Sequence, residues 1–362
     1  MRTPMPEIAC YGLAGHAPSP RELLDEARLA ERIGIGSVFL SERFNAKDAG
    51  VLASAAASAT ERIGIATAAT NHNTRHPLVT ATMAVTLHRL SGGRYAFGLG
   101  RGIDLLFDVM GLPRVTGAQL EDAIGIYRRL WRGEAFGHSG PAGEYPLLSQ
   151  DSSFDERIPV LMMAMGDRSL RLAGRVADGV VLHTFFTDET LARAVALVRG
   201  AAEQAGRDPS SVRIWSVLAT VEDSVPEELR LRKLVGRLAT YLQGYGDVLV
   251  AANRWDPAAL QRFREHPLVQ GYPGAFDAVG SVEELWRLQA EALPAEWLAA
   301  SASGSAEQCA QRIQQQLDAG ADSVVLHGAT PAELEPVVEA WAQVRDARLD
   351  RLPVNPGWTA EP

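Results

Sequence analysis

The feature that most constrains this 362-residue chain is a regular alternation of short apolar runs with amphipathic helical segments. Each run is rich in β-branched and aliphatic residues, and most are followed by a polar turn and apolar residues at helical spacing. The pattern predicts eight strands, at residues 8–12, 37–40, 63–69, 95–99, 159–164, 179–183, 212–221 and 323–327. It predicts helices at about residues 20–33, 77–90, 118–131, 168–176, 188–205, 226–244, 306–319 and 331–347.

Short, continuously apolar strands that alternate with helices indicate a parallel sheet covered on both faces. Eight such units favour an α/β fold of the (β/α)₈ TIM-barrel type. An open doubly wound sheet is the alternative, but no G-x-G-x-x-G follows the first strand. We expect a single domain over residues 1–362, with a small excursion at 133–158 and a helical insertion at about 247–304 between strands seven and eight.

Composition narrows the function classes. The net charge of −9 disfavours nucleic acid as a partner, because phosphate binding needs clustered cations. No apolar stretch is long enough to cross a bilayer and the first residues lack signal-peptide character, so we expect a cytoplasmic protein without a membrane partner. The histidines and two cysteines have no metal-ligand spacing, so no metal site is expected.

Six ordered stretches resemble the luciferase-like monooxygenase superfamily, and in particular its F420-dependent oxidoreductases. They are SVFLSERF (37–44), IGIATAATNHNTRHP (63–77), LSGGRYAFGLGRG (90–102), YRRLWRGEAFGHSG (127–140), PVLMMAMGDRSLRLAGRVADGVVLH (159–183) and GSAEQCAQRIQQQLDAGADSVVLH (304–327). Together they span nearly the whole chain in the family's order. The resemblance implies a luciferase-like TIM barrel whose cofactor lies across the carboxyl ends of the strands.

The resemblance also implies which residues bind the cofactor. In the F420 branch a non-proline cis peptide supports the deazaflavin ring, and the matching bond is Ala68–Ala69. The stretch Ala164–Ser169 matches the family's phosphate-binding turn at a helix N-terminus. Asp167 has an alternative role there as the helix N-cap. The expected cofactor-binding residues are Ser41, Glu42, Ala68, Ala69, Thr70, Asn71, Gly100, Arg101, Ala164, Met165, Gly166, Asp167, Arg168, Ser169 and His183.

The chain departs from the sugar-phosphate dehydrogenases of this branch where they carry catalytic groups. Their Asp-His pair after the second strand is replaced by Glu42 and Arg43, and their glutamate after the fourth strand by Ile103. Sugar-phosphate oxidation is therefore not expected. Glu42, His72 and His183 are candidates for proton transfer, although a histidine at a strand end is more often structural. The sequence assigns no proton donor with certainty.

The favoured hypothesis is an oxidoreductase that moves a hydride between coenzyme F420 and a small organic substrate. Such chemistry needs no protein nucleophile, which agrees with the missing catalytic signature. One alternative is an FMN-dependent monooxygenase served by a separate reductase. Another is a cofactor-binding protein without turnover. The resemblance implies a homodimer, whereas the substrate and the direction of hydride transfer are not predicted.

Overall fold

Eight parallel strands close into a barrel in the computed structural model, which describes residues 2–43 and 46–361. Strand β9 pairs with both β8 and β11, and β11 pairs with β1, so the eight-stranded ring has no open edge. The (β/α)₈ barrel is therefore confirmed and the open sheet is wrong. In chain order the barrel strands are β1 (Met5–Tyr11), β2 (Ile35–Leu40), β3 (Gly64–Thr67), β4 (Tyr95–Leu99), β7 (Val160–Met163), β8 (Gly179–Val181), β9 (Arg213–Glu222) and β11 (Ser323–His327).

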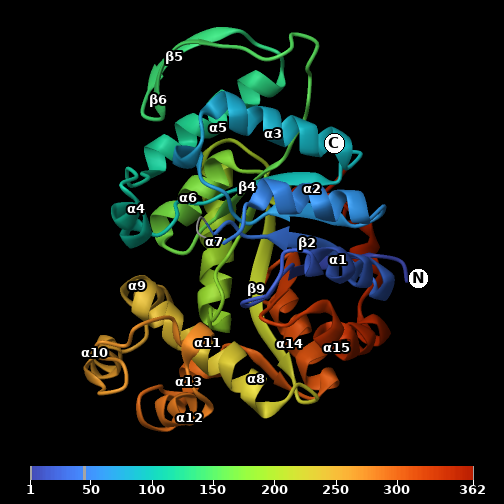
Figure 1. Ribbon diagram of the computed structural model, residues 1–362. Helices are drawn as coiled ribbons and strands as arrows, with labels where there is room; N and C mark the ends of the chain where they lie inside the picture. Colours follow the sequence, from blue (N-terminus) through green and yellow to red (C-terminus); the bar gives the residue numbers. More distant parts are fainter. Residues whose placement is uncertain (1, 44–45, 362) are drawn as a thin grey trace.

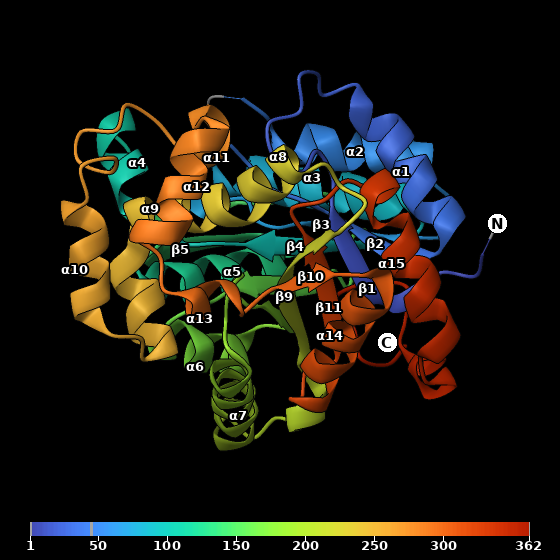
Figure 2. The same ribbon diagram turned by 90° about the horizontal axis from the view of Figure 1, so that it is seen from below.

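Helices surround this barrel and bury their apolar faces against the strands (Figures 1 and 2). They are α1 (Glu22–Ile33), α2 (Ala49–Ala59), α3 (Pro77–Leu90), α5 (Gly117–Trp131), α6 (Asp167–Val176), α7 (Asp188–Gln204), α14 (Ala306–Asp318) and α15 (Pro331–Val344). Shorter segments are η1 (His72–Thr74), α4 (Asp104–Met110), η2 (Pro209–Ser211) and η4 (Ala347–Arg351). Within the described ranges, no helix combines the length and apolar character needed to span a membrane.

Helix α2 was not predicted from the sequence. It consists largely of alanine, so no alternation of apolar and charged residues reveals its buried face. Asp48 begins the helix by accepting a hydrogen bond from the backbone N–H of Val51 (2.9 Å). Alanine has the highest intrinsic helix propensity, and packing against the barrel supplies the remaining stability.

The inward side chains of the strands form a separate core inside the barrel. The side chains of this core differ in size around the barrel: β3 and β4 contribute alanines, whereas β9 contributes Trp215. Strand side chains alternate between the inside and outside of a barrel, so the other positions pack against the helices. The inward core residues are Ala9, Phe39, Ala66, Ala68, Ala96, Leu161, Val181, Trp215, Val217 and Val325.

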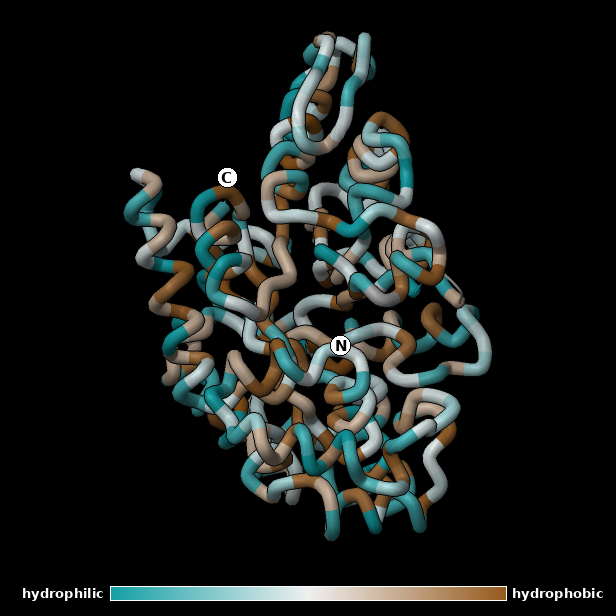
Figure 3. The backbone as a smooth tube through the Cα atoms, turned by 90° about the vertical axis from the view of Figure 1, so that its left-hand side faces the viewer, coloured by the Kyte–Doolittle hydropathy of each residue, from teal (hydrophilic) through white to brown (hydrophobic). Residues whose placement is uncertain are grey.

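Two excursions leave the barrel. The first is an antiparallel hairpin of β5 (Phe136–Gly140) and β6 (Gly143–Leu148), which projects from the molecule and is mostly pale or teal in the hydropathy colouring (Figures 1 and 3). The second is helical and lies between β9 and β11. It contains α8 (Glu227–Leu231), the π-helical turn η3 (Arg232–Gly236), α9 (Arg237–Asn253), α10 (Pro257–Glu265), α11 (Phe276–Val279), α12 (Val282–Glu291) and α13 (Ala295–Leu298).

Helix α9 runs through residue 247, near which the insertion was expected to begin, and it has a kink at Tyr245. The excursion instead begins with α8, directly after β9. It ends in a short strand that was not predicted, β10 (Ala302–Gly304), which pairs with the end of β9. The long helix α9 therefore belongs to the insertion rather than to the regular ring of helices.

Candidate functional site

The carboxyl ends of the strands, here called the mouth of the barrel, bring together most of the predicted site residues. One half of the mouth is built by β3 and β4 from Ala68, Ala69, Gly98 and Gly100, here called the Ala-Gly floor. The Ala68–Ala69 peptide bond is cis, as the resemblance implied. Backbone hydrogen bonds fix this segment: Ala68 N–H donates to Leu40 O (2.7 Å), and Thr70 N–H donates to Gly98 O (3.0 Å).

The glycines of the Ala-Gly floor leave no room for side chains. A Cβ atom on Gly100 would lie 3.1 Å from the Cβ of Ala69, and one on Gly98 would lie 1.7 Å from the carbonyl oxygen of Thr67. The amide of Asn71 holds the following turn by donating to Gly100 O (2.8 Å). Ala68, Gly98 and Gly100 are buried and Ala69 is half-buried, so the two glycines let β3 and β4 pack closely at this end of the barrel.

The side chain of Arg101 is already engaged in an ion pair. Its guanidinium is half exposed and pairs with Asp104 at 3.1 Å. The next residue is restricted to glycine: Gly102 has a φ of +76°, and a Cβ atom there would clash with the ring of Phe107. The predicted role of Arg101 in cofactor binding stays a prediction.

The predicted phosphate turn adopts the geometry of a helix N-terminus. Gly166 is the N-cap of α6, so the alternative role of Asp167 as the cap is wrong: Asp167 is the first residue of the helix. Ser169 Oγ donates to Gly166 O (2.8 Å) and accepts from the N–H of Met165 (3.3 Å). Arg168 is exposed and Ala164 is buried. Anion binding at this turn remains a prediction.

Glu42, a candidate for proton transfer, is already engaged in an ion pair. Both of its carboxylate oxygens accept hydrogen bonds from Arg75, at 2.6 and 3.1 Å, and Thr70 also donates to it. The Glu42 side chain is only 4% exposed. The hydrogen bonds that Arg75 donates to Glu42 raise the pKa of Arg75, so its guanidinium stays charged. This arrangement contradicts a role for Glu42 as a free base and indicates that it fixes the segment beside the cis bond; the neighbouring Ser41 is half-buried.

His72 lies in η1, away from the polar half of the mouth. Burial lowers its pKa, and the Asp122 carboxylate on α5 opposes this effect. Asp122 itself pairs with His138 of the projecting hairpin at 2.9 Å. His72 Nε2 is buried without a hydrogen-bond partner among the described residues. The predicted role of His72 in proton transfer stays a prediction.

The other half of the mouth is polar and aromatic, and here it is called the aromatic wall: Tyr11, His183, Tyr241, Tyr245 and His327. The rings of Tyr11 and His327 lie 4.8 Å apart, and those of His183 and Tyr241 lie 5.0 Å apart. Tyr11 ends β1, His183 follows β8 and His327 ends β11. The two remaining tyrosines come from α9, and their rings contact His183.

Hydrogen bonds determine the protonation of His183. Its Nδ1–H donates to the carbonyl oxygen of Thr184 (2.9 Å), because a carbonyl can only accept. Burial lowers the pKa of His183 to about 4, so the ring is neutral near pH 7 and Nε2 is a bare acceptor. It accepts the Tyr245 O–H at 3.0 Å. Both nitrogens of this candidate are therefore occupied.

His327 has the same tautomer for a similar reason. Its Nε2 receives a hydrogen bond from Arg237 Nη1 (3.3 Å), because a guanidinium can only donate. Its Nδ1–H is then directed to Thr184 Oγ1 at 2.8 Å. Burial, reinforced by the charge of Arg237, lowers the pKa of His327 well below its usual value. Two neutral histidines thus share Thr184 between them.

Sequence reasoning missed the α9 side chains of this half. Arg237, Tyr241 and Tyr245 recur every four residues and therefore lie on one face of a helix. That spacing was a usable signal, but the segment was interpreted as an ordinary barrel helix. Other aromatic residues of the insertion pack with each other: Tyr272 stacks on Phe276 at 3.8 Å, and Trp255 stacks on Trp297 at 4.6 Å.

Comparison with known proteins identifies the family. The family profile described as luciferase-like monooxygenase matches residues 6–323, which is most of the chain. The chain belongs to the luciferase-like monooxygenase family.

Two curated relatives illustrate the similarity, one named as a methylenetetrahydromethanopterin reductase and one as an F420-dependent dehydrogenase. The 5,10-methylenetetrahydromethanopterin reductase of Methanolobus tindarius is 29% identical over 239 residues, covering 64% of this chain and 71% of that protein. The F420-dependent glucose-6-phosphate dehydrogenase of Intrasporangium calvum is 26% identical over 331 residues, covering 85% and 89%. The fold of the coenzyme F420-dependent tetrahydromethanopterin reductase of Methanopyrus kandleri matches with a TM-score of 0.76 at 21% identity, covering 93% of this chain and 97% of that one.

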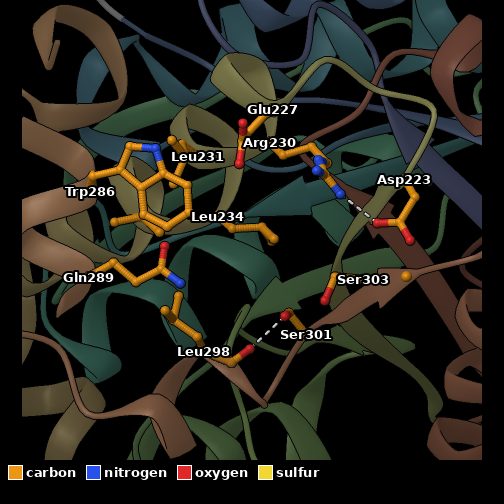
Figure 4. A pocket seen from close by; sticks show the side chains of 12 residues that line it. Asp223, Glu227, Arg230, Leu231, Leu234, Trp286, Gln289, Leu298, Ser301 and Ser303 are labelled. Carbon is orange, nitrogen blue, oxygen red and sulfur yellow. Dashed lines mark hydrogen bonds and ion pairs between the residues drawn. The ribbon is translucent and has the colours of Figure 1, made fainter. Parts of the chain in front are cut away.

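A pocket of about 370 Å³ lies outside the mouth, between η3, α12 and the ends of β9 and β10 (Figure 4). Trp286 and Leu234 flank it on one side, and the ion pair of Arg230 with Asp223 (2.5 Å) lies on another. Ser301 also lines the pocket, and its hydroxyl donates a hydrogen bond to Leu298 O at 2.6 Å. None of the predicted cofactor residues lines this pocket, and several of its polar groups already pair with each other.

The described residues contain no group of three or more histidine, cysteine, aspartate or glutamate side chains placed to hold a metal ion. Phe44, which ends the first stretch that resembles the family, lies outside the described residues.

Proposed function

We propose that the chain is an F420-dependent oxidoreductase that transfers a hydride between the deazaflavin and a small organic substrate. The observation that carries the proposal is the Ala-Gly floor at the carboxyl ends of β3 and β4, where Gly98 and Gly100 add no side chain beside Ala69. The family relatives named as F420-dependent enzymes support the choice of cofactor. When bound, F420 supplies a hydride donor or acceptor, and the protein supplies position and electrostatics.

The residues present fit such a cofactor. The Ala-Gly floor would carry the ring, and the N-terminal turn of α6 at Gly166–Ser169 offers free backbone N–H groups to a phosphate. The Glu42–Arg75 pair fixes the backbone beside the floor, because Glu42 N–H also donates to Ala69 O at 3.2 Å. A substrate would then lie between the ring and the aromatic wall.

Several finer expectations belong to this proposal. We propose that the protein is a cytoplasmic homodimer. A separate reductase would supply reduced cofactor where the reaction requires it. FMN is the alternative cofactor, and a monooxygenase reaction would accompany it. A binding protein without turnover is the alternative of another class.

The test is a titration of the purified protein with F420 and, separately, with FMN, followed by tryptophan fluorescence. We expect micromolar or tighter binding of F420 and much weaker binding of FMN. The reverse preference would favour the monooxygenase, and failure to bind either cofactor would refute the proposal.

A substitution tests whether the Ala-Gly floor carries the ring. Gly100→Ala places a methyl group 3.1 Å from Ala69 Cβ, so we expect F420 affinity to fall about tenfold or more. Gly125→Ala is the matched control, because a Cβ at Gly125 meets no atom within 4 Å. Equal F420 affinity of both variants would place the ring elsewhere.

A further inference from the structure

The pocket outside the mouth, here called the insertion pocket, is large enough for a small organic molecule. Its volume of about 370 Å³ lies within the range of known ligand sites. One side of it comes from the insertion and the other from the ends of β9 and β10 (Figure 4). The lining residues that bear on its chemistry are Glu227, Leu231, Leu234, Trp286, Gln289 and Ser303.

An exposed tryptophan forms one wall of the insertion pocket. Trp286 is 44% exposed, whereas four other tryptophans of the chain are fully buried. Helix α12 packs on the protein through Leu285 and Leu288, which are buried. Trp286 and Gln289 are three residues apart and lie on the face of α12 that lines the pocket. The indole therefore offers an aromatic surface that α12 does not use for its own packing.

Aliphatic side chains complete the apolar part of the pocket. Leu231, Leu234 and Val235 line it from the end of α8 and from the π-helical turn η3. Leu231 and Val235 are buried and Leu234 is half-buried. Leu298 of α13 also lines the pocket. An aromatic face beside aliphatic side chains suits a flat apolar group.

The polar part of the lining favours a cation. Arg230 pairs with Asp223 at 2.5 Å, so one cation and one carboxylate compensate each other. Glu227 adds a second carboxylate, which has no hydrogen-bond or ion-pair partner within residues 2–43 and 46–361. Both this carboxylate and the face of the Trp286 indole attract a positive charge. Gln289 and Ser303, also without a partner in the described ranges, add oxygens that accept hydrogen bonds from an ammonium group.

The turn that lines the insertion pocket also contacts the mouth of the barrel. Lys233 Nζ donates to Gly328 O at 2.9 Å, in the loop that follows β11. Arg237, directly after the turn, donates to His327 at 3.3 Å. Leu234 and Val235 lie between these two cations in the chain, so a ligand against them touches a segment that is bonded to the mouth. π-Helical turns occur frequently at functional sites.

We propose that the insertion pocket binds a small organic cation, an ammonium group on a flat apolar body as in an arylalkylamine, and that this ligand is an effector of the mouth. The apolar body lies against Trp286 and Leu234, and the ammonium group pairs with Glu227. Binding shifts the π-helical turn and with it the contact between Arg237 and His327, which couples the two sites. The proposal goes beyond the proposed oxidoreductase function and does not depend on the cofactor.

The test begins with calorimetric titration of the full chain at pH 7 with 2-phenylethylamine. Phenylacetate and 2-phenylethanol are anionic and neutral analogues of nearly the same shape. We expect the amine to bind with a Kd below about 1 mM, and phenylacetate to bind about tenfold more weakly or not at all. Equal affinity for the amine and phenylacetate would overturn the ligand class. Binding of none of the three would overturn the site.

Substitutions then place the amine in the pocket. Glu227→Gln should weaken amine binding about fivefold and leave 2-phenylethanol binding unchanged. Glu228→Gln is the matched control, because Glu228 also lies in the first turn of α8 but pairs with Arg232 at 3.8 Å and does not line the pocket. Trp286→Ala should weaken binding of the amine about tenfold. Unchanged amine affinity in Glu227→Gln and Trp286→Ala would place the ligand elsewhere and overturn the proposal.

NMR of the histidine rings tests the effector role without any cofactor. Saturation with 2-phenylethylamine should shift the imidazole resonances of His327 and leave those of His138, on the projecting hairpin, unchanged. The titration midpoint of the His327 shift should rise in Glu227→Gln in step with the weaker affinity. Calorimetric binding without a His327 shift would overturn the effector role. A His327 shift with the same midpoint in the unmodified protein and in Glu227→Gln would show that the amine acts directly at the mouth, which would also overturn it.

Discussion

At the scale of single residues, the two sides of the mouth of the barrel hold their polar groups in different ways. Glu42 and Arg75 form a buried ion pair beside the Ala-Gly floor, where each satisfies the other. On the opposite side, His183 and His327 stay neutral because burial removes the hydration that a charged imidazole needs. The buried cation Arg237, which donates to His327, lies directly against these neutral rings.

The neutrality of His183 has a measurable effect on stability. Its pKa is about 4 in the folded protein and about 6.5 in an unfolded chain, so below pH 6.5 the unfolded chain binds more protons. The free energy of unfolding should therefore fall as pH drops from 6.5 to 4, by up to about 3 kcal/mol from this residue. Urea unfolding of the unmodified protein and of His183→Gln measures it.

His183→Gln should show a shallower dependence on pH in this interval, with the part due to His327 remaining. Direct titration by NMR provides a second measurement. An imidazole resonance of His183 that titrates near pH 6.5 in the folded protein would contradict the assigned tautomer and its hydrogen bonds.

At the scale of elements, the position of the α6 N-terminus depends on the close packing of α6 against α7. A Cβ atom at Gly174 would lie 2.3 Å from the carbonyl oxygen of Val198 and 2.9 Å from the Cβ of Ala201. Only glycine lets the two helices approach this closely. The turn at Gly166–Ser169 is therefore held in place from the opposite end of its own helix.

Gly174→Ala should destabilise the protein by about 1–3 kcal/mol, because the two helices must separate or shift. It should also weaken F420 binding through the displaced turn. Gly200→Ala on α7 is the matched control, since a Cβ there meets nothing within 4 Å, and it should be neutral or stabilising by up to about 1 kcal/mol. Thermal unfolding of both variants is the measurement, and equal melting temperatures would contradict the packing argument.

At the scale of the whole molecule, the C-terminal segment closes the end of the barrel opposite the mouth. Arg213 at the start of β9 is fully buried, and its Nη1 donates to the carbonyl oxygens of Pro353, Asn355 and Trp358 at 3.0–3.1 Å. Burial lowers the pKa of Arg213 to about 9. The Trp215 indole N–H donates to Pro356 O at 2.8 Å.

Removing residues 353–362 should destabilise the barrel by about 3 kcal/mol or more, because Arg213 loses carbonyl acceptors while much of its desolvation remains. Arg213→Met in the truncated chain should recover part of this loss, since no unpaired cation is then left. Chemical unfolding of the two single changes and the combination gives the coupling energy. Additive effects would show that the segment stabilises the protein without Arg213.

The sequence by itself determined the barrel, because alternating apolar runs and amphipathic helices leave few ways to bury both faces of a parallel sheet. The resemblance to the family also identified the Ala68–Ala69 bond as cis. The alanine-rich α2 escaped prediction because it has no amphipathic contrast.

Only the tertiary structure decided which polar groups meet. It paired Glu42 with Arg75, and it brought Arg237 and Tyr241 of α9 to His183 and His327, which lie far away along the chain. The physical reason is that periodicity encodes which face of an element is buried, whereas contacts between distant side chains depend on how helices and strands are placed in space.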